Sequence, residues 1–396
     1  ESGLINDDAN TTFSFEPNKT YRLRILNIGG IATFNVYIDG HEMEVIEQDG
    51  VLTKPTHVKG VYLAAGQRLS VLVHSKPTTD TNYRFHANMN PAMFDYVPDD
   101  LELKIQAPIY YNRSHEHFGE IEDPKTKEGY SDAVIPSYAK METLSPQRQI
   151  NLTITFELNT DGLSHGSINN VPYLTPFVPT LHTLLTVGDL ANNPKVYGPQ
   201  TNVYLLEKDQ VVELVINNID DGPHPFHLHG HYFQVIGRGS GVFHKDARIT
   251  PEPKYPTVRD TIVTTPNGYV VLRFKADNPG AWIFHCHLDW HLPAGLAVIF
   301  IDAVEEARQQ TLPQAYIDLC HNLGLPGTGN AAGKEGLDLE GAPDGVRPIK
   351  ETFVLGCIIA TLVGLSTLIW HVWVDPGTSE DEEEEDQAPL MKGETQ

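Results

Sequence analysis

The segment HCHLDWH at residues 285–291 decides the fold of this chain, together with HPFHLHGH at residues 224–231. A single histidine is more often a surface or hydrogen-bonded core residue than a metal ligand. Six of the seven histidines in these two short segments, together with one cysteine, have spacings that instead indicate a transition-metal site, whereas His231 is expected only to pack or hydrogen-bond. The seven candidate ligands are His224, His227, His229, His285, Cys286, His287 and His291.

The order of these ligands along the chain divides them into two sets. Successive side chains of a β-strand point to opposite faces of its sheet. If residues 285–287 lie on a strand, both histidines of HCH share one face and the cysteine points to the other. His227 and His229 likewise share one face, whereas His224 has the opposite parity. We therefore expect one set made of His224, Cys286 and His291, and a second made of His227, His229, His285 and His287.

The first set has the ligands of a blue-copper electron-transfer site, two histidines and a cysteine. Leu296 follows His291 by five residues, where a weak axial ligand usually stands, and leucine cannot bind the metal. Without an axial ligand, Cu(I) is favoured and the reduction potential rises. The second set is all imidazole, which suits copper that handles dioxygen. Cys286 is bonded along the chain to a histidine of the second set on each side, which gives an electron a short covalent path between the sites.

These motifs resemble those of the multicopper oxidases. The resemblance rests on HPFHLHGH and HCHLDWHLPAGL, on HEMEVIEQDG at 41–50, and on the run 178–198. Within the family it points to the fungal membrane-anchored ferroxidases of high-affinity iron uptake, over most of residues 1–330 and the C-terminal layout. It implies copper as cofactor, Fe(II) and dioxygen as substrates, and an iron permease in the same membrane as partner.

The resemblance also implies which copper each imidazole serves. His227 corresponds to a type 2 ligand, and His229, His285 and His287 correspond to type 3 ligands. The family's three-copper cluster uses eight histidines from its first and last domains, and the one His-x-His pair in residues 1–223, His115 and His117, lacks a ligand pattern. We therefore expect this chain to be the C-terminal two-thirds of a longer oxidase, with Cys320 a candidate partner for the remaining domain.

The strand pattern predicts an all-β protein of the sandwich or barrel type, and the family resemblance implies two cupredoxin-like Greek-key sandwiches. Short apolar runs separated by Gly, Pro, Asn and Asp are typical of such folds. We expect a sandwich without copper at 1–115, a linker at 116–147 and the copper-binding sandwich at 148–325. Helices are expected at 303–310 and 313–323, after the last strand.

The C-terminal part reads as a membrane anchor. A Gly-rich polar stretch at 326–352 predicts a flexible stalk, and the 22 uncharged residues 353–374 are long enough to span a bilayer. Residues 375–396 form an acidic tail. Counting basic residues alone would put the large domains in the cytosol, but large domains translocate largely regardless of charge. Four Asn-x-Ser/Thr sequons, at residues 10, 18, 112 and 151, favour a secretory route. Together with the copper chemistry and the family resemblance, they imply an extracellular glycoprotein in the plasma membrane, with a cytoplasmic tail.

Composition and two aspartates bear on the substrate. The formal net charge of −24 argues against nucleic acid and is compatible with attracting cations. Asp220 lies four residues before His224, so its carboxylate is expected beside that ligand. Asp95 matches a position where the resemblance implies a second carboxylate at the iron site.

Two other functions remain open from the sequence. A laccase-like oxidase of phenols or aromatic amines would use the same copper sites with an apolar pocket at the rim instead of hard oxygen ligands. A copper-binding or permease-chaperone subunit without turnover would be compatible with the incomplete set of cluster ligands.

Overall fold

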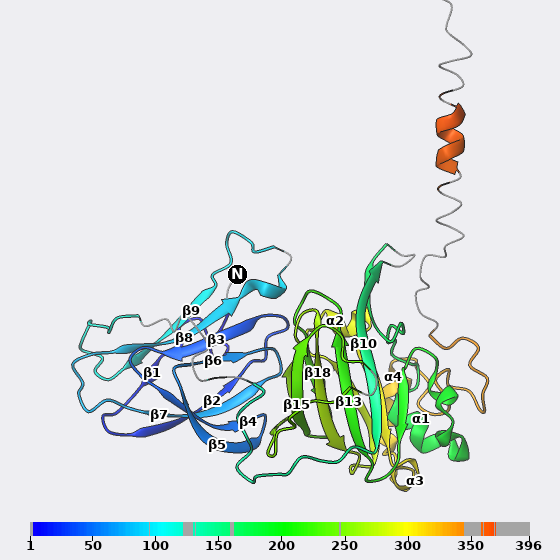
Figure 1. The fold of residues 1–396 in the computed structure, drawn as a ribbon, viewed down its shortest axis with the longest axis horizontal. Coiled ribbons are helices and arrows are strands. Elements are labelled where there is room, and N and C mark those ends of the chain that lie inside the picture. Colours follow the sequence, from blue (N-terminus) through cyan, green and yellow to red (C-terminus); the bar gives the residue numbers. More distant parts are fainter. Residues whose placement is uncertain are drawn as a thin grey trace, which may run out of the picture. The chain divides into compact units, whose positions relative to one another are not determined.

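The computed structural model describes residues 3–94, 96–121, 130, 132–158, 162–244 and 247–343, and, near the C-terminus, residues 358, 360–367 and 369. The chain divides into two units, residues 1–346 and 347–396. The first unit is mostly β and contains both of the predicted sandwiches (Figure 1).

The first sandwich, drawn in blue to cyan in Figure 1, is built from two sheets. One sheet has the order β1 (Phe13–Ser14), β9 (Lys104–Tyr110), β8 (Tyr83–Asn90), β3 (Thr33–Ile38), β6 (Gly60–Leu63). The other has the order β2 (Thr20–Leu26), β7 (Arg68–His74), β4 (Met43–Gln48), β5 (Val51–Val58). Strand β2 shows why these segments form half-buried strands: in TYRLRIL the burial alternates residue by residue, which matches the two-residue period of a strand. A short 3-10 helix, η1 (Pro91–Met93), follows β8.

The second sandwich, green to yellow in Figure 1, also has two sheets. The larger has the order β11 (Ser164–Ile168), β10 (Arg148–Leu158), β13 (Val211–Asn218), β18 (Gly268–Lys275), β15 (Phe233–Ser240), β16 (Thr257–Arg259). The smaller has the order β12 (Val203–Leu206), β20 (Ala297–Asp302), β19 (Gly280–Cys286), β14 (Pro225–Leu228), β17 (Thr261–Val263). Their inner faces share one core, in which Phe226, Phe284 and Cys286 are completely buried.

Short helices accompany the smaller sheet: α1 (Thr180–Thr186), η2 (Gly188–Asn192), η3 (Pro194–Tyr197), α2 (His291–Ala294), α3 (Val304–Ala307) and α4 (Gln314–Asn322). Residues of α1, η3 and α3 pack with Ile299 and Ile301 in a second core of this domain. The two helices expected after the last strand are present, as α3 and α4, and both are shorter than predicted.

Two of the expected connections are more ordered than a linker or stalk. In the segment 116–147, Tyr130 and Ile135 are buried in the core of the first sandwich. The prediction that a flexible stalk begins at residue 326 is wrong for its first part. Ala331 exchanges backbone hydrogen bonds with Phe177 and Val196, and Asn330 is fully buried. The Gly-rich composition at this point serves tight turns, with Gly329 and Gly333 at positive φ, rather than flexibility.

Most of the predicted membrane segment 353–374, and the whole acidic tail, lie outside the described residues. The described positions 358, 360–367 and 369 are helical. Within the described part of the chain, no helix combines the length and apolar content needed to cross a membrane.

A buried ion pair joins the two sandwiches. The guanidinium of Arg259, the last residue of β16, and the carboxylate of Asp49, just after β4, are both fully buried and make two hydrogen bonds of 2.8 and 3.2 Å. Tyr130 adds its hydroxyl at 3.4 Å from Arg259 Nη1. Removing one member of such a pair leaves the other charge unpaired in a low-dielectric interior, which is strongly destabilising.

We expect Asp49→Asn to lower the free energy of unfolding by about 3–5 kcal/mol. The matched control is Glu47→Gln, which breaks the part-exposed Arg22–Glu47 pair of 2.6 Å and is expected to cost no more than about 1 kcal/mol. Denaturant unfolding measures the free energy of unfolding of the two variants. Equal losses would mean that the buried pair contributes no more to stability than the part-exposed pair.

Candidate metal centre

The pairing of β14 with β19 positions both sets of candidate ligands. In this antiparallel pair Phe226 lies opposite Cys286 and His227 lies opposite His285. Because neighbours on a strand point to opposite faces, the thiol projects into the sandwich core and the two imidazoles project away from it. Both strands end here, β14 at Leu228 and β19 at Cys286, so His229 and His287 stand just beyond the strand ends.

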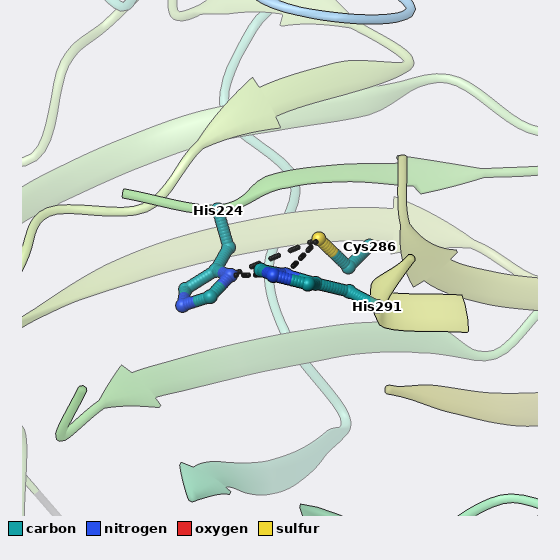
Figure 2. Close-up of side chains that lie close together, drawn as sticks. All are labelled: His224, Cys286 and His291. Carbon is teal, nitrogen blue, oxygen red and sulfur yellow. Dashed lines mark hydrogen bonds between the residues drawn. The ribbon is translucent and has the colours of Figure 1, made fainter. Parts of the chain in front are cut away.

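The first set meets at one point, as Figure 2 shows. His224 Nδ1 lies 3.0 Å from His291 Nδ1, and Cys286 Sγ lies 3.8 and 3.5 Å from these two nitrogens. The ligand atoms are all within 4.8 Å of one another. His224 precedes β14 and His291 is the first residue of α2, so three separate elements supply the group.

The donors of this group suit a soft or borderline metal. Burial raises the pKa of the Cys286 thiol to about 12, and burial, followed by the nearby His224, lowers the pKa of His291 to about 4. The buried thiol and the two imidazole nitrogens face one another at distances at which a single cation could take all three as ligands. Such His₂Cys sets bind copper in electron-transfer sites, so the residues present fit that metal.

Asp220 lies behind His224. The His224 Nε2–H donates to Asp220 Oδ2 over 2.9 Å, which leaves the lone pair on Nδ1 directed at the site. The hydrogen bond from His224 outweighs burial and holds the pKa of Asp220 below its usual range. The Asp220 side chain is 25% exposed. The expected proximity of this carboxylate to the ligand is therefore present in the structure.

Leu296 is completely buried beside the same group. Its carbonyl accepts from the Cys286 backbone N–H over 3.1 Å, and its own N–H donates to the His291 carbonyl over 3.0 Å. Phe156 of β10 packs on the rings of His224 and His291, with centroids 5.7 and 5.1 Å away. The surroundings of the His₂Cys group are thus apolar on these sides.

The second set also comes together. His229 Nε2 and His285 Nε2 are 3.1 Å apart, and the ring centroids of His227, His229, His285 and His287 lie 4.7–6.0 Å from their neighbours. Burial is the main cause that lowers the pKa of His285, to about 4, and that of His229. Three of the rings line an open pocket of ≈ 600 Å³ that also contains Arg68 and Asp260. Imidazole nitrogens gathered around such a pocket are suited to metal binding.

Several supporting residues carried no signal in the sequence. His227 Nδ1 is 3.0 Å from both the Asp260 carbonyl and Thr261 Oγ1. His231 turns to the buried Asp302, with 2.8 Å between Nε2 and Oδ2, and its Nδ1 is 3.2 Å from the His229 carbonyl. Neither Asp260 nor Asp302 stands in a motif with metal-ligand spacing, so only the fold reveals these contacts.

Two further residues singled out in the sequence are Asp95 and Cys320. Asp95 lies outside the described residues, so its place relative to Asp220 is not defined. Cys320 is buried near the end of α4, with its Sγ 3.9 Å from His182 Nδ1.

Two β-sandwiches with a buried His₂Cys group at the strand ends of the second define a copper protein of the cupredoxin class. Family models described as multicopper oxidase match residues 1–102 and 173–306. The crystal structure of Fet3p, described as a multicopper oxidase that functions in iron import, aligns with a TM-score of 0.83 at 35% identity, over 88% of this chain and 68% of that one. The chain belongs to the multicopper oxidase family, whose cofactor is copper.

Similar relatives carry iron transport in their names. The iron transport multicopper oxidase FET5 of Saccharomyces cerevisiae is 39% identical over 91% of this chain and 63% of its own length. The iron transport multicopper oxidase fio1 of Schizosaccharomyces pombe is 37% identical over 98% of this chain and 64% of its own length. The chain therefore spans a little under two-thirds of the length of these relatives.

The lowered pKa values of the buried histidines make the stability of the copper-free protein depend on pH. An unfolded histidine takes up its proton near pH 6.5, whereas His285 and His291 do so only near pH 4 when folded. The unfolded state therefore binds more protons in this window, and stability falls as the pH drops from about 6.5 to about 4. One pKa unit corresponds to about 1.4 kcal/mol.

His291→Asn should make this loss shallower, as followed by the melting temperature of the copper-free protein at several pH values. His57→Asn is the control, because the His57 side chain is 65% exposed. If the melting temperature depends on pH in the same way in both variants and the parent, His291 is not a cause of the loss of stability at low pH.

Proposed function

We propose that this chain is part of a multicopper ferroxidase that oxidises Fe(II) to Fe(III) and reduces dioxygen to water, in high-affinity iron uptake. Support comes from the His₂Cys group, from the four imidazoles beside it, and from relatives named for iron transport. Iron is favoured as the substrate because the carboxylate of Asp220, a hard oxygen ligand, is hydrogen-bonded to Nε2 of the candidate copper ligand His224.

His224, Cys286 and His291 would hold type 1 copper, with Leu296 in the axial direction. His224, Cys286 and His291 would thereby provide a site for single-electron transfer by copper, and the second set would provide one for the reduction of dioxygen. The protein supplies the surroundings. Phe156 and Leu296 make the surroundings of the group apolar. Asp220 accepts a hydrogen bond from the proton-bearing Nε2 of His224, so that Nδ1 keeps its lone pair for a metal.

Asp220 would also contact the substrate. Fe(II) is bound by hard oxygen ligands, and a carboxylate stabilises the Fe(III) product more than the Fe(II) substrate. Binding at Asp220 therefore lowers the iron potential and favours loss of the electron. The part-exposed side chain is accessible to such an ion, and the hydrogen bond to His224 connects it to the ligand. Asp95 would supply a second carboxylate.

The four imidazoles would form half of the cluster that binds dioxygen, with His227 serving the type 2 copper and His229, His285 and His287 the type 3 pair. The open pocket along three of the rings leaves room for additional imidazoles. We propose that these come from outside residues 1–396, as the family's eight-histidine cluster implies.

The site would work at the outer surface of the plasma membrane. The 22 uncharged residues 353–374 would be a single anchor, the β domains 1–115 and 148–325 would be extracellular, and 375–396 would be cytoplasmic. An iron permease in the same membrane would take up the Fe(III) product.

Leu296→Met should lower the potential of the type 1 site, because a thioether in the axial direction stabilises Cu(II). Spectroelectrochemistry of the blue absorption band measures this potential. An unchanged or raised value would mean that residue 296 does not face the copper.

The ferroxidase proposal is tested by Asp95→Ala combined with Asp220→Ala in the full-length gene product. We expect oxidation of Fe(II) to slow by an order of magnitude or more, while oxidation of an aromatic amine changes little. Asp221→Ala is the matched control, since Asp221 is the exposed neighbour of Asp220.

The type 1 absorption band is recorded for each variant to verify that the copper site is intact. Equal losses on both substrates would place the defect at the copper, and an unchanged rate with iron would favour the laccase-like alternative.

A further inference from the structure

The sandwich without candidate ligands reaches into the four-imidazole site through three consecutive residues, Gly66, Gln67 and Arg68. A Cβ on Gly66 would lie 2.4–2.9 Å from the ring of His287, so only glycine leaves room for that ring. Gln67 is fully buried and its amide donates to the Thr261 carbonyl over 3.3 Å. These contacts place the turn before β7 directly against the imidazoles of the other domain.

Arg68 makes the strongest of these contacts. Its two terminal nitrogens each donate to one oxygen of Asp260 over 2.6 Å, a paired geometry that fixes the plane of the carboxylate. Nη1 also donates to the Gly66 carbonyl over 2.9 Å, and the Arg68 backbone N–H donates to the buried Asp49 over 2.9 Å. The guanidinium is therefore held at a defined position relative to Asp260.

Asp260 in turn controls a hydroxyl beside His227. Thr261 Oγ1 donates to Asp260 Oδ1 over 2.8 Å. With its proton committed there, this hydroxyl presents only lone pairs to His227 Nδ1, which is 3.0 Å away. The Asp260 carbonyl, also 3.0 Å from Nδ1, is an acceptor as well. Both partners require a proton on Nδ1, which leaves the lone pair on Nε2.

We propose that Arg68, from the sandwich without ligands, is a positioning residue that sets the tautomer of His227 through Asp260 and Thr261. Partners that fix the tautomer and orientation of a ligating histidine raise metal affinity by about 10- to 100-fold. Without Arg68, the Asp260 carboxylate is free to turn away, and the Thr261 hydroxyl is released to donate to Nδ1. Of these partners, the Asp260 backbone carbonyl alone then still favours a proton on Nδ1. The preference for a proton on Nδ1 is therefore weakened, and the alternative tautomer has no lone pair on Nε2 with which to bind a metal at the pocket. The inference rests on the proposed role of His227 as a type 2 copper ligand.

The test uses the full-length gene product loaded with copper, and measures copper per chain and the type 2 electron paramagnetic resonance signal relative to type 1. Arg68→Met should lose most of the type 2 signal and keep the type 1 signal. The double variant Arg68→Met with Thr261→Val should regain it, because valine has the shape of threonine and no proton to donate. Thr261→Ser should match the parent.

Arg238→Met is the matched control. Its ion pair with Asp132 is 2.9 Å long with side chains 31% and 13% exposed, against 33% and 11% for Arg68 and Asp260. It does not touch the imidazoles and should keep both signals. If Arg68→Met does not fold, as seen from a lost type 1 band, Arg68→Lys replaces it. That variant keeps the charge but not the paired contact, so a partial loss restored by Thr261→Val is expected.

The outcomes separate this inference from the proposed function. A parent protein without any type 2 signal would refute the proposed assignment of the cluster. A parent with the signal, and an Arg68→Met variant that retains it, would overturn only the role of Arg68. Equal loss in Arg68→Met and in the double variant would overturn it too, because general damage to the fold is not repaired by removing a hydroxyl.

Discussion

The register between β14 and β19 is the constraint on which the rest of the site depends. Cys286 lies opposite Phe226, and His285 lies opposite His227. The two-residue period of the strands then sends the sulfur into the apolar core and the imidazoles to the other face. A shift of one residue in this pairing would send each of these side chains to the opposite face, and neither set of candidate ligands would then meet. The surrounding sandwich, with Phe226 and Phe284 completely buried, makes such a shift costly.

Much of this arrangement follows from the order of residues along the chain. Alternation on a strand sufficed to separate His224, Cys286 and His291 from the other four candidates, and the structure brings each set together. The strands themselves were also predictable, because segments such as TYRLRIL alternate between apolar and polar residues. Short helices such as α1, and the burial of Asn330, were not predictable. The sequence of α1, TLHTLLT, is too short to show a clear helical period, and the sequence around Asn330 is Gly-rich, so both are compatible with loops and depend on contacts distant in the chain.

The supporting polar groups were the least predictable part. Asp260 follows Arg259 in the sequence, yet these two charges have different partners. Arg259 pairs with Asp49 inside the junction of the sandwiches, and Asp260 pairs with Arg68 at the pocket. Both partners belong to the domain that provides no candidate ligand. Composition and motif spacing describe each domain separately, whereas these ion pairs depend on how the domains meet.

The buried thiol of Cys286 has a consequence for how the protein acquires its metal. Its pKa of about 12 means that the apo protein carries a proton on sulfur at any physiological pH, and a metal must displace it to bind the thiolate. Occupancy of the His₂Cys group is then a competition between copper and hydrogen ions. By mass action, each unit of acidification raises the free copper needed for half-loading about tenfold, from this one proton alone. At the proposed copper site, acidity and scarce copper therefore act in the same direction, against loading of the metal.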